Sequence, residues 1–311
     1  MHARVAVLAL LAACQSAPAA PPTRSGAADA KPGPGATTAA QAPRAAGPAA
    51  GAGAVNADMS RATDILRAQV ASLRNGDDAF VASFAADAVV LVPDARAAHG
   101  DTTGLREAIA RLNPHDTLKD VKIVKVIAGS SPSAVWWSAE LTLIVDSKEP
   151  ESPPHATETV LRLTELATAD AGWKVVAGAF AAVAKPENRA DPDEIDASST
   201  TAPGPLTPLL ADPAKLDASL APHAVVFGTD KAEAAWDIAA GHTLLKSWIK
   251  LALSINGQPR ELRGKHWGFA IADVDWKQPK EKSPARMAAL VIATPASATT
   301  WQVVAVQYTA Y

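Results

Sequence analysis

SFAADAVVLVPD, at residues 83–94, recurs later in the chain as SLAPHAVVFGTD, at residues 219–230. The two stretches share Ser, Ala, the triplet Ala-Val-Val and the final Asp in one register. Each joins the end of an expected helix to a short apolar run rich in β-branched residues, which is typical of a strand. A stretch that occurs twice in this way predicts two copies of one small unit.

Two further landmarks follow this stretch in the same order in both halves of the chain. The second landmark is an Asp that precedes an expected helix, and the third is a closing strand with Trp at its start. The matching pairs are Asp101 and Asp237, Trp173 to Ala177 and Trp301 to Ala305, and Phe180 and Tyr308. Three landmarks in one order predict an internal duplication.

The composition fits a chain that folds around hydrophobic cores and argues against one class of partner. Hydrophobic residues make up 48% and charged residues 20% of the 311 residues, and this length suggests about two domains. The formal net charge is -3, and the sequence contains no sustained basic run. We therefore expect no nucleic-acid partner.

The first residues, MHARVAVLALLAACQS, have the pattern of a secretory signal. Arg4 and the amino terminus form a short positive region, and residues 5–11 form an apolar region too short to span a bilayer. The run Leu11-Ala12-Ala13-Cys14 resembles the lipobox of bacterial lipoproteins, in which the Cys becomes the first mature residue and carries acyl chains. The alternative is an ordinary signal peptide that contains a cysteine.

Cys14 is the only cysteine in the sequence. Lipid attachment at Cys14, which the lipobox implies, would explain a single cysteine in an exported protein. Several acyl chains hold a protein on a bilayer far better than one, so we expect a membrane anchor through the N-terminal lipid. Gln15 resembles the residue that directs lipoproteins of Gram-negative cells to the outer membrane. The expected location is therefore the cell envelope, facing the periplasm or the cell surface.

Composition divides the chain into five segments. Residues 1–13 form the expected signal peptide. Residues 14–57 are nearly all Ala, Pro, Gly, Ser and Thr, cannot bury enough apolar surface to become ordered, and predict a disordered tether. Residues 185–204 are polar and proline-bearing, which predicts a linker. The folded domains are then expected at residues 58–184 and 205–311.

Hydrophobic periodicity predicts helices first and strands afterwards in each domain, an order that favours α+β over alternating β and α elements. Ile65, Leu66, Val70 and Leu73 recur at helical spacing, and the period changes to two at Val121. In the first domain we expect helices near residues 65–73, 77–84 and 101–112, and strands over 88–92, 121–127, 133–145, 157–166 and 173–183. In the second we expect helices over 206–210, 213–220 and 243–251, and strands over 224–227, 267–274, 286–294 and 300–308.

The first domain resembles the NTF2-like superfamily, most closely its SnoaL-like and DUF4440-type members. In these, a helix and a segment of the form gDa..f...fa.DAvv..P precede a further helix and a curved sheet. The residues that fill these positions are Gly76, Asp77, Phe80, Phe84, Asp87, Ala88, Val89, Val90 and Pro93. The resemblance covers residues 58 to about 183 well. It extends to the second domain more weakly, through the repeat.

The resemblance implies an α+β fold of two tandem NTF2-like cones, the second divergent. In each cone, N-terminal helices pack on a curved, mostly antiparallel sheet and leave a pocket at the open end. Members of this superfamily include enzymes, binding modules and structural subunits, so the fold alone fixes no function. No short motif fixes acid-base positions, and we assign no catalytic residue.

Titratable side chains offer no clear site in the sequence. His115-Asp116 follows a helix end and is expected in a solvated loop. His242, Lys265 and His266 lack metal-ligand spacing, and we expect no metal site. Asp273 and Asp275 lie two residues apart on one strand face and are expected to face water. The sequence contains no nucleotide-binding or hydrolase motif, and we expect no cofactor.

The sequence contains eight Trp residues beside two Tyr. Trp173 and Trp301 occupy equivalent positions and are expected in the pocket or core. Trp136 and Trp137 are neighbours on one strand and point to opposite faces. Trp137 shares the aliphatic face and is a further pocket or core candidate. Trp136 shares the more polar face and is the interface candidate. NTF2-like proteins often dimerise through the outer sheet face, so we expect an intramolecular pseudo-dimer of the two domains, with Trp136 at the contact.

Three classes of function stay open at this point. The leading prediction is a non-enzymatic, membrane-anchored envelope lipoprotein that binds a small apolar ligand or a protein partner. The second is a SnoaL-like isomerase, cyclase or hydrolase with an acid-base residue in the cone. The third is a structural or assembly protein whose cones are closed. A buried carboxyl or His with a perturbed pKa favours the enzyme, an apolar pocket favours binding, and filled cones favour the structural class.

Overall fold

The structure, a computed structural model, describes residues 52–75, 77–91, 117–147, 155–182, 204–277 and 284–310. The expected signal peptide, Cys14, the helix over 101–112 and His115-Asp116 lie outside these residues, as does nearly all of the expected linker. Within the described ranges, no helix combines the length and the apolar character that a membrane span requires.

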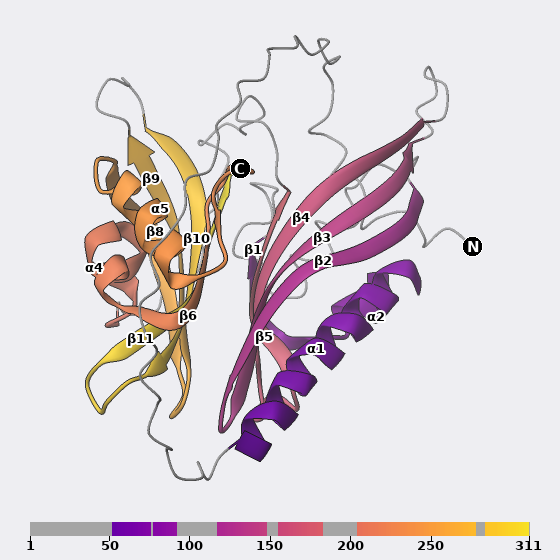
Figure 1. The fold of residues 1–311 in the computed structure, drawn as a ribbon, viewed down its shortest axis with the longest axis horizontal. Helices are drawn as coiled ribbons and strands as arrows, with labels where there is room; N and C mark the ends of the chain where they lie inside the picture. Colours follow the sequence, from indigo (N-terminus) through magenta and orange to yellow (C-terminus); the bar gives the residue numbers. More distant parts are fainter. Residues whose placement is uncertain are drawn as a thin grey trace, which may run out of the picture.

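Within the described ranges, the first unit contains two helices followed by a five-stranded sheet (Figure 1). Its elements are α1 (Ala52–Asn75), α2 (Asp77–Val81), β1 (Phe84–Leu91), β2 (Thr117–Ser131), β3 (Ala134–Ser147), β4 (His155–Thr168) and β5 (Lys174–Ala182). The strand order is β1-β5-β4-β3-β2, with β1 parallel to β5 and the other pairs antiparallel. Helix α1 begins at Ala52, inside the stretch whose composition predicts a tether, and packs against β2 and β3.

The second unit consists of short helices and a six-stranded sheet. Its elements are η2 (Thr207–Ala211), α4 (Pro213–Ala218), β6 (Leu220–Phe227), β7 (Ala234–Ala235), α5 (Ile238–Trp248), β8 (Ala252–Arg263), β9 (Gly268–Lys277), β10 (Ala285–Pro295) and β11 (Trp301–Ala310). The strand order is β7-β6-β11-β10-β9-β8. Strands outweigh helices in both units, so the expected α+β class holds only in part and the described fold is dominated by two mixed sheets.

The five strands of the first sheet match five strands of the second in order, and β7 is an addition at the edge of the second sheet. In the first, Val89 lies opposite Ala177 after a register shift, and in the second Val225 lies opposite Ala305 after the same shift. The first strands also share one pattern of burial along their eight residues. Both begin four residues before the expected Ala88 and Ala224, at Phe84 and Leu220. The duplication predicted from the sequence landmarks therefore matches the strand order and register of the structure.

The inner face of each sheet carries its own core. In the first unit, the alternation predicted for residues 133–145 is confirmed, because one face of β3 is fully buried against the helices. Its residues are Val135, Trp137, Ala139, Leu141, Leu143 and Val145. In the second unit, Leu210, Leu245, Val274 and Tyr308 are among the buried residues of the corresponding core.

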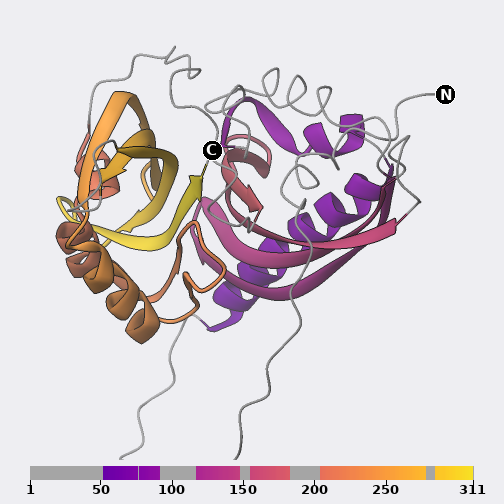
Figure 2. The same cartoon turned by 90° about the horizontal axis from the view of Figure 1, so that it is seen from above.

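A third hydrophobic cluster joins the outer faces of the two sheets. It includes Val89 and Leu166 from the first unit and Phe269 and Leu290 from the second, all of them buried. The sheets therefore lie between the helices of the two units, with α1 on one side and α4 and α5 on the other (Figures 1 and 2). This arrangement buries the outer sheet faces, as sheet-on-sheet packing requires.

Strand β8 is the long element that periodicity missed; the two-residue strand β7 was not expected either. Strand β8 carries Gly257, whose φ of 70° suits glycine, and Pro259, which cannot donate to a strand ladder. These residues interrupt the alternation at a register shift between Asn256 and Arg260. The strand tolerates both because it lies at the edge of its sheet.

Candidate functional site

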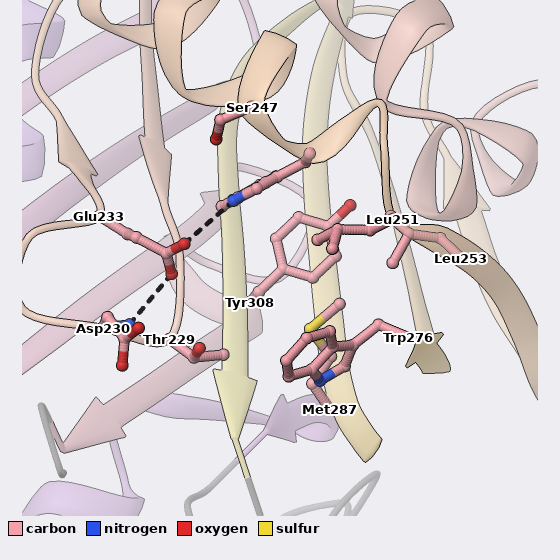
Figure 3. Close-up of a pocket in the computed structure, with 10 residues that line it drawn as sticks. Thr229, Asp230, Glu233, Ser247, Leu251, Leu253, Trp276, Met287 and Tyr308 are labelled. Carbon is pink, nitrogen blue, oxygen red and sulfur yellow. Dashed lines mark hydrogen bonds between the residues drawn. The ribbon is translucent and has the colours of Figure 1, made fainter. Parts of the chain in front are cut away.

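The second unit contains a pocket at the end of its sheet beside α5 (Figure 3). Its volume is about 220 Å³. The lining residues come from the β6–β7 loop, the end of α5, and strands β8 to β11. They are Thr229, Asp230, Glu233, Ser247, Trp248, Leu251, Leu253, Trp276, Met287 and Tyr308.

One wall of the pocket is aromatic and aliphatic. The rings of Trp248 and Tyr308 meet edge to face, with centroids 5.1 Å apart, and Trp276 and Met287 continue the wall (Figure 3). The Tyr308 hydroxyl donates to the Leu210 carbonyl oxygen at 2.9 Å, which fixes its ring. Burial raises the pKa of Tyr308, so its phenol stays protonated and serves as a hydrogen-bond donor.

The opposite wall is acidic. The Glu233 carboxylate accepts from the Trp248 indole nitrogen at 3.0 Å and from the Asp230 backbone nitrogen at 3.1 Å (Figure 3). Asp230 lines the same wall, and its side chain is not needed for these bonds. No Lys, Arg or His occurs among the lining residues, so the pocket carries two carboxylates without a basic partner in its lining.

Arg162, which belongs to the first unit, binds the backbone of the loop that forms the acidic wall. This side chain lies on β4 and is 1% exposed. Its guanidinium donates to the backbone carbonyl oxygens of Asp230, at 2.7 Å, of Glu233, at 3.3 Å, and of Lys231. The Glu140 carboxylate lies 3.3 Å from its Nε. The position of the pocket wall in the second unit therefore depends on a buried charge of the first.

The first unit buries a carboxyl group inside its own core. Glu165, on β4, is 0% exposed and accepts from the side-chain amide of Gln69, on α1, at 3.0 Å. Burial raises the pKa of Glu165 to about 8, although the neighbouring Gln69 and Trp137 act in the opposite direction. At neutral pH this group is therefore mostly a neutral acid.

The second unit has no counterpart of this acid. Glu165 lies between Trp137 and Gly178 across the sheet, and at the matching register Val291 lies between Ala270 and Val306. The two units thus keep one fold but place polar groups in different parts of it: a buried acid in the first, and an acid-lined pocket in the second.

The structure distributes the predicted aromatic candidates over several places. Trp137 is fully buried in the first core. Trp173 and Trp301 are half-buried at the edges of their cores, and the guanidinium of Arg61 lies 3.9 Å from the ring centre of Trp173. Trp136 is half-buried and packs against the cluster that joins the two sheets. None of the four lines the pocket of the second unit.

The titratable candidates from the sequence form no common site. His242 pairs with Asp217 at 2.6 Å on the helical side of the second unit. The expectation that Asp273 and Asp275 face water is wrong: Asp273 is buried, and Asp275 accepts from Arg286 at 2.9 Å. Asp273 shares a face of β9 with Phe269 and Ile271, which belong to the cluster between the two sheets, and periodicity alone does not reveal this packing. Across the described ranges, no group of three or more His, Cys, Asp or Glu residues is placed to hold a metal ion.

Sequence reasoning missed the residues that define both polar features. Glu165 could have been noticed, since it interrupts the apolar positions Leu163 and Ala167 on one face of a strand. The pocket acids, Asp230 and Glu233, carry no such signal, because a loop between short elements has no periodicity.

Comparison with known proteins gives weak structural likenesses and no function. No protein-family model and no curated protein matches the chain. Solved structures with similar folds include a ketosteroid isomerase-like protein from Erwinia carotovora atroseptica, with 13% identity, a TM-score of 0.33, and coverage of 42% of this chain and 99% of that chain.

Two further similar structures are NTF2-like proteins. One is a protein of unknown function from Pseudomonas putida, with 15% identity, a TM-score of 0.28, and coverage of 32% of this chain and 73% of that chain. The other is from Salmonella enterica serovar Typhimurium, with 13% identity, a TM-score of 0.28, and coverage of 34% and 82%. By their names, these three similar structures are NTF2-like or ketosteroid isomerase-like proteins.

Proposed function

We propose that the chain is a membrane-anchored envelope lipoprotein that binds a small, mainly apolar molecule in the pocket of its second unit. The pocket carries this proposal. Leu251, Leu253, Met287 and the aromatic residues supply apolar walls, and few polar groups converge on them. Ligand sites are usually of this kind, largely apolar with a small number of placed polar groups.

The size of the pocket supports a ligand of modest size. Its volume of about 220 Å³ exceeds that of an engineered apolar cavity of about 150 Å³ that binds benzene. A single substituted ring is therefore a suitable occupant, whereas a large lipid is not.

Binding of a probe in the pocket can be followed by the fluorescence of the tryptophans that line it. Binding of a small aromatic probe, either phenyltrimethylammonium or tert-butylbenzene, should change the fluorescence of Trp248 and Trp276 in the full chain. Ser247→Phe, at the exposed rim, should abolish the change, and Thr243→Phe, one turn earlier on α5 and outside the lining, should preserve it. Equal responses in both variants would remove the pocket as the binding site.

The membrane anchor is the second part of the proposal. The lipobox at Leu11 to Cys14 supports it, and the residues before Ala52 are the proposed link to the membrane. Within the NTF2-like superfamily, the finer assignment to the SnoaL-like and DUF4440 type rests on the segment from Gly76 to Pro93. Cys14→Ser should release the chain from the membrane fraction, and a variant that stays membrane-bound would contradict lipid attachment.

Glu165 favours one alternative, an enzyme of the SnoaL-like type. A buried acid with a raised pKa can transfer a proton at neutral pH. Such an acid must be reachable, so a water-soluble carbodiimide should modify Glu165 in the folded protein. Modification only after addition of urea would make Glu165 part of the packed core and remove this alternative.

A further inference from the structure

The charges around the pocket of the second unit suggest what kind of molecule it takes. Asp230 and Glu233 are both lining residues, and the lining contains no basic side chain. Building on the proposed function, we propose that the ligand is an organic cation: a bulky, substituted ammonium group joined to an apolar body.

Nearby cations do not cancel the negative charge of the pocket. Arg162 lies behind the acidic wall, where it is paired with Glu140 and bonded to backbone oxygens. The charges of Arg162 and Glu140 sum to zero, which leaves the negative charges of Asp230 and Glu233. Lys231 belongs to the same loop, but its side chain is exposed and does not line the pocket. The pocket therefore disfavours an anion and favours a cation.

The aromatic wall fits the same ligand. Trp248, Trp276 and Tyr308 line the same pocket as Asp230 and Glu233. Ring faces attract cations, and aromatic side chains are the usual means by which proteins recognise substituted ammonium groups. An apolar neutral molecule would use the rings but bring no positive charge to the two carboxylates.

The bonds of Glu233 favour a bulky ammonium over a planar, multiply donating cation. Each of its oxygens already accepts one bond, from Trp248 or from the Asp230 backbone. Both oxygens are thus held in place, and two parallel bonds to a guanidinium would compete with existing donors. A bulky, substituted ammonium group binds through the negative charge of the pocket and surface contact, and it needs no new hydrogen bond.

The acidic wall is fixed before any ligand arrives. The Gly228 backbone nitrogen donates to the Glu233 carbonyl at 2.8 Å, and the Glu233 nitrogen donates to the Asp230 carbonyl at 3.0 Å. A Cβ at Gly228 would lie 2.3 Å from the Glu233 carboxylate and 2.7 Å from the Trp248 ring, so only glycine allows this approach. Preorganisation of this kind lowers the cost of binding.

Two probes of the same shape test the proposal in the full chain. Phenyltrimethylammonium carries a positive charge, and tert-butylbenzene replaces its nitrogen by carbon. Tryptophan fluorescence titrations should give at least about tenfold tighter binding of the cation, as expected for a desolvated cation over aromatic faces beside carboxylates. Phenylacetate should bind more weakly than either.

Charge-removing variants show where the preference arises. Asp230→Asn keeps the loop bonds, which use the Asp230 backbone, and should reduce the preference for the cation several-fold without weakening tert-butylbenzene. Glu233→Gln should reduce it further, and Asp170→Asn, in the exposed turn after β4, is the matched control with no expected effect.

Equal affinity for the two probes would overturn the cation proposal and leave an apolar binding site. A preference that persists unchanged in both Asp230→Asn and Glu233→Gln would overturn it as well. Binding of neither probe would overturn the cation proposal together with the proposed function. Thermal denaturation of each variant checks that the fold is retained.

Discussion

Replacing Glu165 by Gln should remove most of the pH dependence that this residue gives to the stability of the protein. The side chain is 0% exposed and accepts one hydrogen bond from Gln69 at 3.0 Å. A glutamine has nearly the same shape, its carbonyl oxygen can accept the same bond, and it cannot ionise. The substitution therefore removes the titration while it keeps the packing.

The magnitude follows from the two pKa values of Glu165. Burial raises its pKa from 4.5 to about 8 in the folded protein. Between these values the folded state binds more protons than the unfolded state, so this contribution to stability is complete below pH 4.5 and is lost as the pH rises to about 8. From pH 5 the loss is about 2.5 kcal/mol at pH 7 and about 4 kcal/mol at pH 8.5, an upper estimate for one group.

Urea denaturation of wild type and Glu165→Gln at pH 5, 7 and 8.5 measures this loss. Relative to pH 5, the unfolding free energy of the wild type should fall against that of Glu165→Gln by about 2.5 kcal/mol at pH 7 and about 4 kcal/mol at pH 8.5. Asp170→Asn removes an exposed carboxylate of the same unit and should leave the wild-type slope unchanged. Parallel pH profiles for wild type and Glu165→Gln would refute the conclusion that Glu165 is a neutral buried acid.

Three other substitutions test the contacts that join and fill the units. Arg162→Met should destabilise the protein by about 3–5 kcal/mol in urea, because it leaves Glu140 and three loop carbonyls without their partner, and should speed amide exchange in residues 228–235. Trp136→Ser should destabilise by about 2 kcal/mol, since the ring covers Gly129 and packs against the cluster between the sheets; unchanged melting would remove Trp136 from the contact. Tyr308→Phe should cost about 1–2 kcal/mol by leaving the Leu210 carbonyl unpaired, and unchanged stability would show that this bond is dispensable.

The parts of the fold that sequence could predict are those that local pattern encodes. Alternation in β3 gave the correct buried face, because the side to which a strand residue points depends only on its position. The matching closing strands gave the repeat, since Trp301 begins β11 and Trp173 directly precedes β5. Strand β8 was missed where Gly257 and Pro259 interrupt its pattern.

Local sequence pattern could not predict the candidate site, for a different reason. The bonds from Arg162 to the loop around Asp230 join residues about 70 positions apart, and no periodicity predicts such a contact. Asp273 was expected in water because it lies near the end of a strand, whereas its face of β9 packs in the cluster between the two sheets. Glu165 was the exception, since its charge on an apolar strand face could be read from sequence.

The most direct test of ligand binding in the second unit is a native mass spectrum of the full chain purified from its own membrane in mild detergent. We expect one small molecule per chain in the wild type and in Thr243→Phe, and none in Ser247→Phe, where the new ring occupies the pocket. The same bound mass in Ser247→Phe as in the wild type would contradict this expectation.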